Sequence, residues 1–189
     1  MFLTKQAILD AVSKNQIAIE PFHEKHLSPN SIDVTLNEKL LVYDIGEEGC
    51  LDMKKQTPTR EITISEEGYV LQPNMLYIGS TNETATSNTF IPMFEGRSSI
   101  GRLGINTHIT AGFGDIGWGY QELEDGSTKC LYPTWTLEIC VVHPVRVYPN
   151  VRIGQVYFVK PEGAISFYKG KYSGQRTPQP SKSYLDFQK

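Results

Sequence analysis

Cysteine is scarce in this sequence and is not arranged in pairs. The 189 residues include three, Cys50, Cys130 and Cys140, and no C-x-x-C motif. This spacing excludes a disulfide framework and a cysteine-based structural zinc site, and we expect three reduced thiols in a cytoplasmic protein. The four histidines form neither H-x-x-x-H nor H-x-E, so the sequence also lacks a recognisable metal cage.

Long apolar runs and an excess of positive charge are absent as well. No apolar stretch approaches the ~20 residues of a membrane span. Residues 1–10 carry Lys5 and Asp10 where a secretion signal has a continuous apolar core. The net charge is −3 and the pI is near 5.8. We therefore expect neither a nucleic-acid partner nor a membrane partner, and an anionic ligand needs a local cationic cluster.

Helical periodicity is confined to the N-terminus. Ile8, Leu9 and Val12 form an apolar stripe that Thr4 can cap and Asn15 can end. Further along, short alternating runs are separated by Gly, Pro and Asn, which is typical of an all-β sandwich or barrel. The predicted strands are 31–36, 60–64, 69–71, 75–80, 135–142, 145–148 and 154–160.

These patterns predict a single mainly β domain over residues 1–189, a β-barrel with one leading helix. The C-terminal segment, residues 168–189, is polar and contains several glycines and prolines. Such a segment buries little apolar surface by itself, so we predict a mobile arm or lid.

The stretch from Phe94 to Gly112 combines small, flexible and cationic residues. Arg97 and Arg102 offer guanidinium forks, while Ser98 and its neighbour Ser99 add hydroxyl donors among four glycines. Phosphate groups are bound by backbone N–H groups of Gly-rich turns and by arginine, so the stretch is a candidate phosphate site. Its composition is equally consistent with a surface loop carrying two solvated arginines.

Glu138 is the one carboxylate in the apolar run 135–142. An outward-facing residue of an alternating strand explains it without any function. The functional alternative is a buried general acid/base partnered by Arg102, because desolvation tunes a carboxyl group for proton transfer.

Asp115 and His108 have similar alternatives. Asp115 follows two glycines and suits an Asx turn as well as a ligand contact. His108 lies between Thr107 and Thr110, where a hydrogen-bonded structural histidine is the usual outcome.

Several motifs together resemble the dCTP deaminases of the dUTPase-like superfamily. The matching stretches are EGRSSIGRLGINTHITAGFGDIGW, TLEI, IGQVYF, GKYSGQRTPQPSKSY and, near the start, SPNSIDVTL. The resemblance implies a distorted dUTPase-like β-barrel that assembles as a homotrimer, with its sites between subunits. The implied reaction is hydrolytic deamination of dCTP to dUTP and ammonia, in pyrimidine deoxynucleotide metabolism.

The resemblance also assigns roles to residues. It implies that Glu138 relays protons between the attacking water and the cytosine amino group, and that Ser98, Arg102 and the backbone of Ala111 position that water. Mg²⁺ would enter with the triphosphate, no zinc would be used, dTTP is a candidate feedback inhibitor and His108 a candidate regulatory residue. The implied substrate contacts are Arg97, Ser99, Asp115, Thr136, Leu137, Gln155, Tyr168, Lys171, Tyr172 and Gln175.

The sequence departs from the family pattern between Gly119 and Thr136. Sixteen residues, 120–135, stand where two or three are usual. Asp125 and Gly126 within them are a strong hairpin signal, so we predict two strands extended beyond the barrel.

Three functions remain open from the sequence. The first is a dCTP deaminase that releases dUTP. The second is a bifunctional enzyme that also removes pyrophosphate to give dUMP, which the stretch HITAGF favours by its resemblance to that branch. The third is a non-catalytic nucleotide-binding regulator, although Glu138 and Arg102 are both present.

Overall fold

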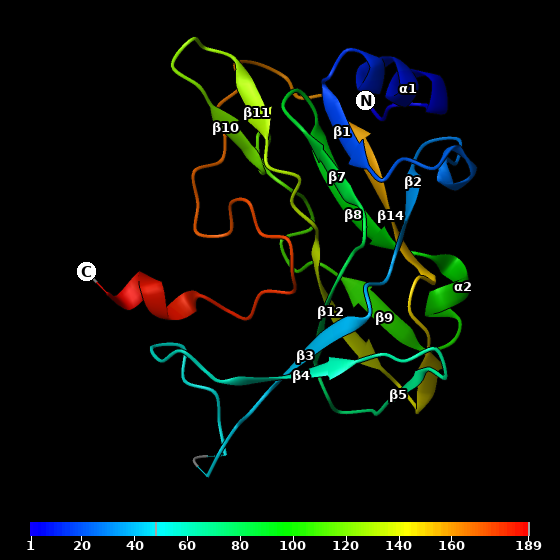
Figure 1. Ribbon diagram of the computed structural model, residues 1–189, viewed down its shortest axis with the longest axis vertical. Coiled ribbons are helices and arrows are strands. Elements are labelled where there is room, and N and C mark those ends of the chain that lie inside the picture. Colours follow the sequence, from blue (N-terminus) through cyan, green and yellow to red (C-terminus); the bar gives the residue numbers. More distant parts are fainter. Residues whose placement is uncertain (48, 189) are drawn as a thin grey trace.

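The computed structural model describes residues 1–47 and 49–188, and strands dominate it (Figure 1). The helices are α1 (Lys5–Ser13) and the short α2 (Ser98–Gly101), with 3₁₀ turns η1 (Glu24–His26) and η2 (Ser183–Phe187). No helix in these ranges is long and apolar enough to cross a membrane. The strands are β1 (Ile17–Glu20), β2 (Ile32–Thr35), β3 (Lys39–Tyr43), β4 (Thr59–Thr63), β5 (Tyr69–Leu71), β6 (Tyr77–Ser80), β7 (Thr84–Ser87), β8 (Ile91–Gly96), β9 (Ile105–His108), β10 (Tyr120–Glu122), β11 (Thr128–Cys130), β12 (Thr136–Val141), β13 (Val145–Val147) and β14 (Arg152–Val159).

Within residues 1–47 and 49–188, the strands form five antiparallel sheets rather than one barrel. The largest has the order β4-β3-β6-β12-β9, and a second has the order β2-β14-β8. Three pairs, β1-β7, β5-β13 and β10-β11, complete the fold. The predicted mainly β class with an N-terminal helix is therefore confirmed, whereas the strands of the described residues close no barrel.

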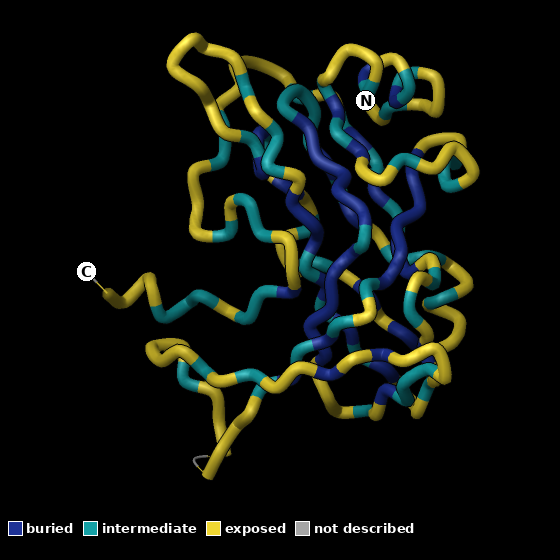
Figure 2. The backbone as a smooth tube through the Cα atoms, viewed as in Figure 1, coloured by how far each residue is buried: buried dark blue, intermediate teal, exposed yellow. Residues whose placement is uncertain are grey.

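Strand β12 lies near the centre of the largest sheet, and its alternation decides which side chains are buried. Leu137, Ile139 and Val141 point into the core, with exposures of 0%, 0% and 6%. Thr136 and Glu138 point to the opposite, half-buried face. Figure 2 shows this core as a continuous buried band running through the strands.

The predicted elements appear with small shifts in their ends. Helix α1 begins directly after Thr4, although the Thr4 side chain makes no capping hydrogen bond. Asn15 follows the helix with a left-handed φ of 57°. The hairpin predicted within residues 120–135 is formed by β10 and β11, and Asp125 Oδ1 accepts a hydrogen bond from Ser127 N at its turn.

Strands β1, β3, β7, β8 and β9 were not predicted. Strand β7 shows one reason, because its sequence is TATS and yet all four residues are buried. The hydroxyl groups make this possible by bonding to backbone carbonyls, as Thr86 Oγ1 does to Trp118 O. Strands β8 and β9 flank α2 and overlap the stretch from Phe94 to Gly112, whose small and cationic residues favoured a binding or surface loop.

Glu83 is a buried carboxylate that ties strand β2 to the turn before β7. Its side chain is 4% exposed. One oxygen accepts Thr35 N over 2.7 Å and the other accepts Thr35 Oγ1 over 2.9 Å. The Nδ1 atom of His26 lies 4.0 Å from Oε1. Removing this carboxylate leaves a buried N–H without an acceptor, which is a large penalty in a protein interior.

We expect Glu83→Ala to lower the free energy of unfolding by about 2–4 kcal/mol, because it orphans the Thr35 amide and leaves a cavity. Urea denaturation at fixed protein concentration measures the change. Glu61→Ala is the matched control, since that exposed residue forms a surface ion pair with Lys39 over 3.1 Å, worth about 0–1 kcal/mol. Equal losses in the two variants would contradict this account of Glu83.

Candidate active site

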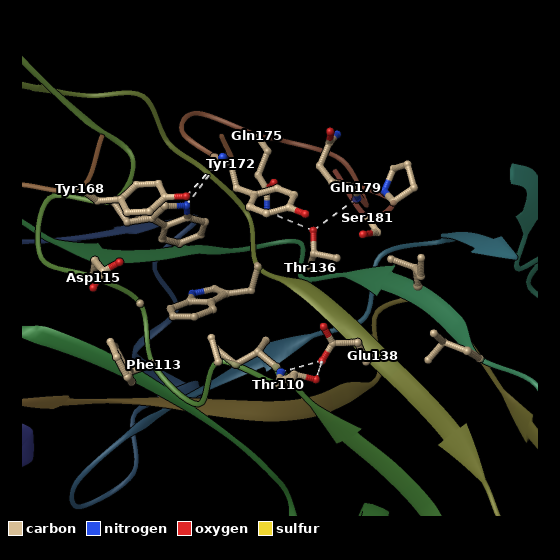
Figure 3. A pocket seen from close by; sticks show the side chains of 18 of the residues that line it. Thr110, Phe113, Asp115, Thr136, Glu138, Tyr168, Tyr172, Gln175, Gln179 and Ser181 are labelled. Carbon is tan, nitrogen blue, oxygen red and sulfur yellow. Dashed lines mark hydrogen bonds between the residues drawn. The ribbon is translucent and has the colours of Figure 1, made fainter. Parts of the chain in front are cut away.

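A pocket of about 510 Å³ opens between the face of β12, the loop after β9 and the C-terminal tail (Figure 3). The sequence-predicted residues that line it are Ala111, Asp115, Thr136, Glu138, Tyr168, Tyr172 and Gln175. Other residues that line it were not predicted from the sequence, among them Tyr43, Thr110, Phe113, Gln179 and Ser181.

Glu138 is held by one of its two carboxylate oxygens. Its Oε2 accepts Thr110 N over 2.7 Å and Thr110 Oγ1 over 3.0 Å (Figure 3). Strand register places His108 opposite Glu138, with the His108 Nε2 atom 3.8 Å from Oε2. No described residue donates to Oε1, which leaves this oxygen available to a ligand.

Two details of the prediction for Glu138 are wrong for the single chain. Its side chain is 32% exposed rather than buried, because it lies on the pocket face of β12. Arg102 does not pair with it among the described residues, and Thr110 holds it instead. In the sequence, the only hint that Thr110 belongs to the site is its position two residues after His108. The pairing of β9 with β12 then shows that Thr110 reaches the Glu138 carboxylate.

Thr136 lies two residues before Glu138 on the same face and binds the C-terminal tail. Its Oγ1 accepts Gln175 Nε2 over 3.1 Å and Gln179 N over 3.3 Å. The other end of the Gln175 amide, Oε1, is buried without a hydrogen-bond partner. Glu138 Oε1 is therefore available to a ligand, whereas Gln175 Oε1 is enclosed by the protein.

The tail is packed along the pocket through its tyrosines. Tyr168 N donates to Ile116 O over 3.0 Å, and Tyr168 OH accepts Tyr172 N over 3.3 Å. Trp118 Nε1 donates to Tyr172 O over 3.1 Å, and Lys182 N to Tyr172 OH over 2.8 Å. Backbone and aromatic contacts thus hold a segment whose composition is polar.

Lys171 is not among the residues that line the pocket. It donates to Asp186 Oδ2 over 2.6 Å. That hydrogen bond raises the pKa of Lys171, because it favours the charged ammonium. Leu137 is also absent from the lining, since its side chain faces the core.

The remaining predicted residues, Arg97, Ser98, Ser99, Arg102 and Gln155, lie on another part of the chain. Figure 1 shows α2, which contains Ser98 and Ser99, on the side of the molecule away from the tail.

Two of these residues belong to hydrogen-bonded networks around β2. Arg97 Nε lies 3.1 Å from Asp33 Oδ1, and Arg152 Nη1 lies 3.1 Å from Asp33 Oδ2. Gln155 accepts Ser31 Oγ and donates to Gly96 O. The structure thus divides the predicted site into a carboxylate half, at the pocket, and an arginine half, around α2 and β14.

Within residues 1–47 and 49–188, no group of three or more His, Cys, Asp or Glu residues is close enough to hold a metal ion. The chemistry that the pocket residues themselves offer is proton transfer by Glu138, since a carboxylate fixed through one oxygen can exchange protons through the other.

Comparisons with known proteins give a consistent result. The family model described as dCTP deaminase-like matches residues 2–160. A protein of Clostridium beijerinckii named "dCTP deaminase, dUMP-forming" is 46% identical over 191 residues, covering 100% of both chains. One of Leptospira biflexa serovar Patoc with the same name is 48% identical over 191 residues, covering 100% of this chain and 99% of the relative.

A solved structure is similar in fold. The 2'-deoxycytidine 5'-triphosphate deaminase of Agrobacterium tumefaciens aligns with a TM-score of 0.56 and 22% identity. The alignment covers 83% of this chain but only 47% of that longer chain.

Proposed function

Since the chain belongs to the dCTP deaminase-like family, we propose that it deaminates dCTP and releases dUMP as its final product. The observation that carries the proposal is the pocket carboxylate Glu138, held at Oε2 by Thr110 and free at Oε1. The names of relatives that are 46% and 48% identical over their full length favour the dUMP-forming reaction over release of dUTP.

The deamination step needs a base and an acid, and Glu138 can serve as both in turn. Water adds to C4 of the cytosine while the ionised Glu138 takes one of its protons at Oε1. The same carboxyl group delivers that proton to N3, which completes the addition of water across the C4=N3 bond. It then moves the proton of the new C4 hydroxyl group to the amino group, which leaves as ammonia while the C4 carbonyl forms. The bonds from Thr110 support this role, because they fix the carboxylate and leave one oxygen to move the proton.

The pocket also offers a group that reads the base. Gln175 donates through Nε2 to Thr136 and has an unpartnered Oε1. Because Oε1 is buried in this position, it would accept the amino group of cytosine only after the Gln175 side chain turns toward the nucleotide. The Ala111 backbone and the Asp115 side chain complete the proposed contacts to water and deoxyribose.

We propose that the arginine half of each site comes from a second copy in a homotrimer. Ser98 and Arg102 would position the water, while Arg97, Ser99 and Gln155 would meet the triphosphate. Their separation from the pocket of the same chain supports this arrangement. A symmetric ring brings two different surfaces of the chain together at every interface, so each pocket would receive one arginine half.

Mg²⁺ fits this proposal as part of the nucleotide. Because the described side chains form no cluster for a resident ion, phosphate oxygens and water would be its ligands, as is usual for Mg²⁺. The ion would neutralise charge on the triphosphate. The deaminated nucleotide would then lose pyrophosphate while it is still bound together with Mg²⁺, through attack of water on the α-phosphorus. His108, beside Glu138, remains the candidate through which dTTP would act.

We expect Glu138→Gln to lower kcat for deamination by about 10²–10⁴-fold or more, because the amide keeps the shape but cannot exchange protons. Calorimetric titration with dCTP and Mg²⁺ should show affinity close to wild type. Glu66→Gln, an exposed carboxylate in the turn before β5, is the control and should keep full activity. Near-normal turnover by Glu138→Gln would refute the proton relay.

We expect one incubation with dCTP and Mg²⁺ to yield ammonia, pyrophosphate and dUMP in equal amounts, because the two hydrolytic steps act on the same bound nucleotide. Chromatography of the nucleotides together with assays of both small products makes the measurement. Accumulating dUTP without pyrophosphate would indicate a deaminase only. Unchanged dCTP would indicate the nucleotide-binding regulator instead.

We expect Glu138→Gln and Arg102→Ala to be inactive alone but to complement each other after joint unfolding and reassembly. If each site combines Glu138 of one copy with Arg102 of another, a random mixture restores about a quarter of the sites. The control is each variant reassembled with itself. A mixture with no activity above those controls would place Arg102 and Glu138 in the same copy.

A further inference from the structure

Residues 131–134, between the hairpin β10–β11 and strand β12, are fixed to the domain at both ends. Leu131 N donates to Gly119 O over 2.7 Å, and the following residue Trp135 donates its N–H to Thr81 Oγ1 over 3.1 Å. Pro133 lies between these two anchors, and its ring restricts φ. We call residues 131–134 the tail seat, because the C-terminal tail rests on them.

The tail meets the tail seat through contacts around Gln175. Arg176 donates from Nε and from Nη2 to the single acceptor Leu131 O, over 3.1 and 3.0 Å. Thr134 N donates to Gln175 O over 3.0 Å. Gly174 lies so close to Leu131 that an added Cβ would come within 3.2 Å of its Cδ1 atom. The backbone is therefore held before, at and after Gln175.

The Gln175 side chain points from this held backbone into the pocket (Figure 3). Its Nε2 donates to Thr136 Oγ1 over 3.1 Å, which fixes the orientation of the amide. Its Oε1 is buried and has no hydrogen-bond partner. A buried acceptor without a partner is costly, so the contacts on both sides of Gln175 must offset this cost to keep the amide in place.

We propose that Arg176 is a positioning residue: by clamping Leu131 O it holds the Gln175 amide against Thr136, and so keeps this part of the tail in place beside Glu138 where the nucleotide would bind. The inference rests on the proposed deamination of dCTP, because that proposal assigns the pocket beside Glu138 to the nucleotide. Arg176 itself is exposed and is not among the pocket residues, so it acts through Gln175.

The clamp matters because it lies directly beside Gln175, whereas the contacts of Tyr168 and Tyr172 hold an earlier part of the tail. Fixing a backbone costs about 1–2 kcal/mol per residue, and the tail is polar with several Gly and Pro residues. A guanidinium is planar and offers two parallel N–H groups with little further loss of freedom, which a lysine ammonium cannot match. Loss of Arg176 should therefore let Gln175 leave its place without unfolding the domain.

The test compares Arg176→Gln with Arg146→Gln. Arg146 is a matched control, since its Nη1 also donates to a backbone carbonyl, Glu67 O, over 3.1 Å. Arg146 belongs to β13 and does not line the pocket. We expect Arg176→Gln to raise KM for dCTP about tenfold with kcat changed less than about threefold. Arg176→Lys should recover part of this loss, and Arg146→Gln should match wild type.

A second readout needs no activity. Without nucleotide, trypsin should cut after Lys169 and Lys171 faster in Arg176→Gln than in wild type or Arg146→Gln, as followed by mass spectrometry. An unchanged KM would overturn the proposal even if cleavage accelerates, because Arg176 would then only anchor the tail. Unchanged cleavage would equally overturn it. If wild-type protein does not turn over dCTP, the proposed function fails, while the cleavage rates still decide whether the clamp exists.

Discussion

The register of β12 between β6 and β9 is the constraint on which the site depends. Alternation along this strand sends Leu137 and Ile139 into the core and leaves Thr136 and Glu138 facing the pocket. The pairing with β9 then brings Thr110 to the carboxylate, just beyond the end of that strand. A slip of one residue would exchange the two faces, burying Glu138 and exposing the core residues. The hydrophobic core therefore stabilises the position of the candidate catalytic group.

The same strand also couples the carboxylate to the tail. Thr136 receives hydrogen bonds from both Gln175 and Gln179, and it lies two residues from Glu138 on one face. Displacement of the tail therefore removes a pocket wall next to the carboxylate. Since the tail is polar, hydrogen bonds to a rigid strand and to residues 131–134 replace the apolar burial that orders most segments.

The sequence was sufficient for the mainly β class and for the hairpin in residues 120–135, because each produces a local pattern. The catalytic role of Glu138 stays a prediction, and it came from the family resemblance, since the local pattern fits an outward-facing strand residue equally well. The sequence was insufficient wherever contacts join distant segments. Arg102 was paired with Glu138 from motif chemistry, yet the chain brings Thr110 to that carboxylate. Strand β7 was missed because its buried residues are polar, and their partners lie far away in the sequence. Hydrophobic periodicity cannot report a side chain whose burial depends on a hydrogen bond.

In the arginine half, one buried aspartate pairs with two arginines. Asp33 is 5% exposed and lies between Arg97 and Arg152, so two cations share one anion and a net positive charge remains. Asp33 binds Arg97 through Nε, which leaves the terminal nitrogens of that guanidinium without a partner among the described residues. A fixed guanidinium with free terminal N–H groups suits a phosphate. Because this group and Glu138 lie on different parts of one chain, the proposed site requires two unlike surfaces to meet. Contacts of that kind close into rings when copies are related by rotation, so under the proposed function assembly and catalysis would depend on the same interface.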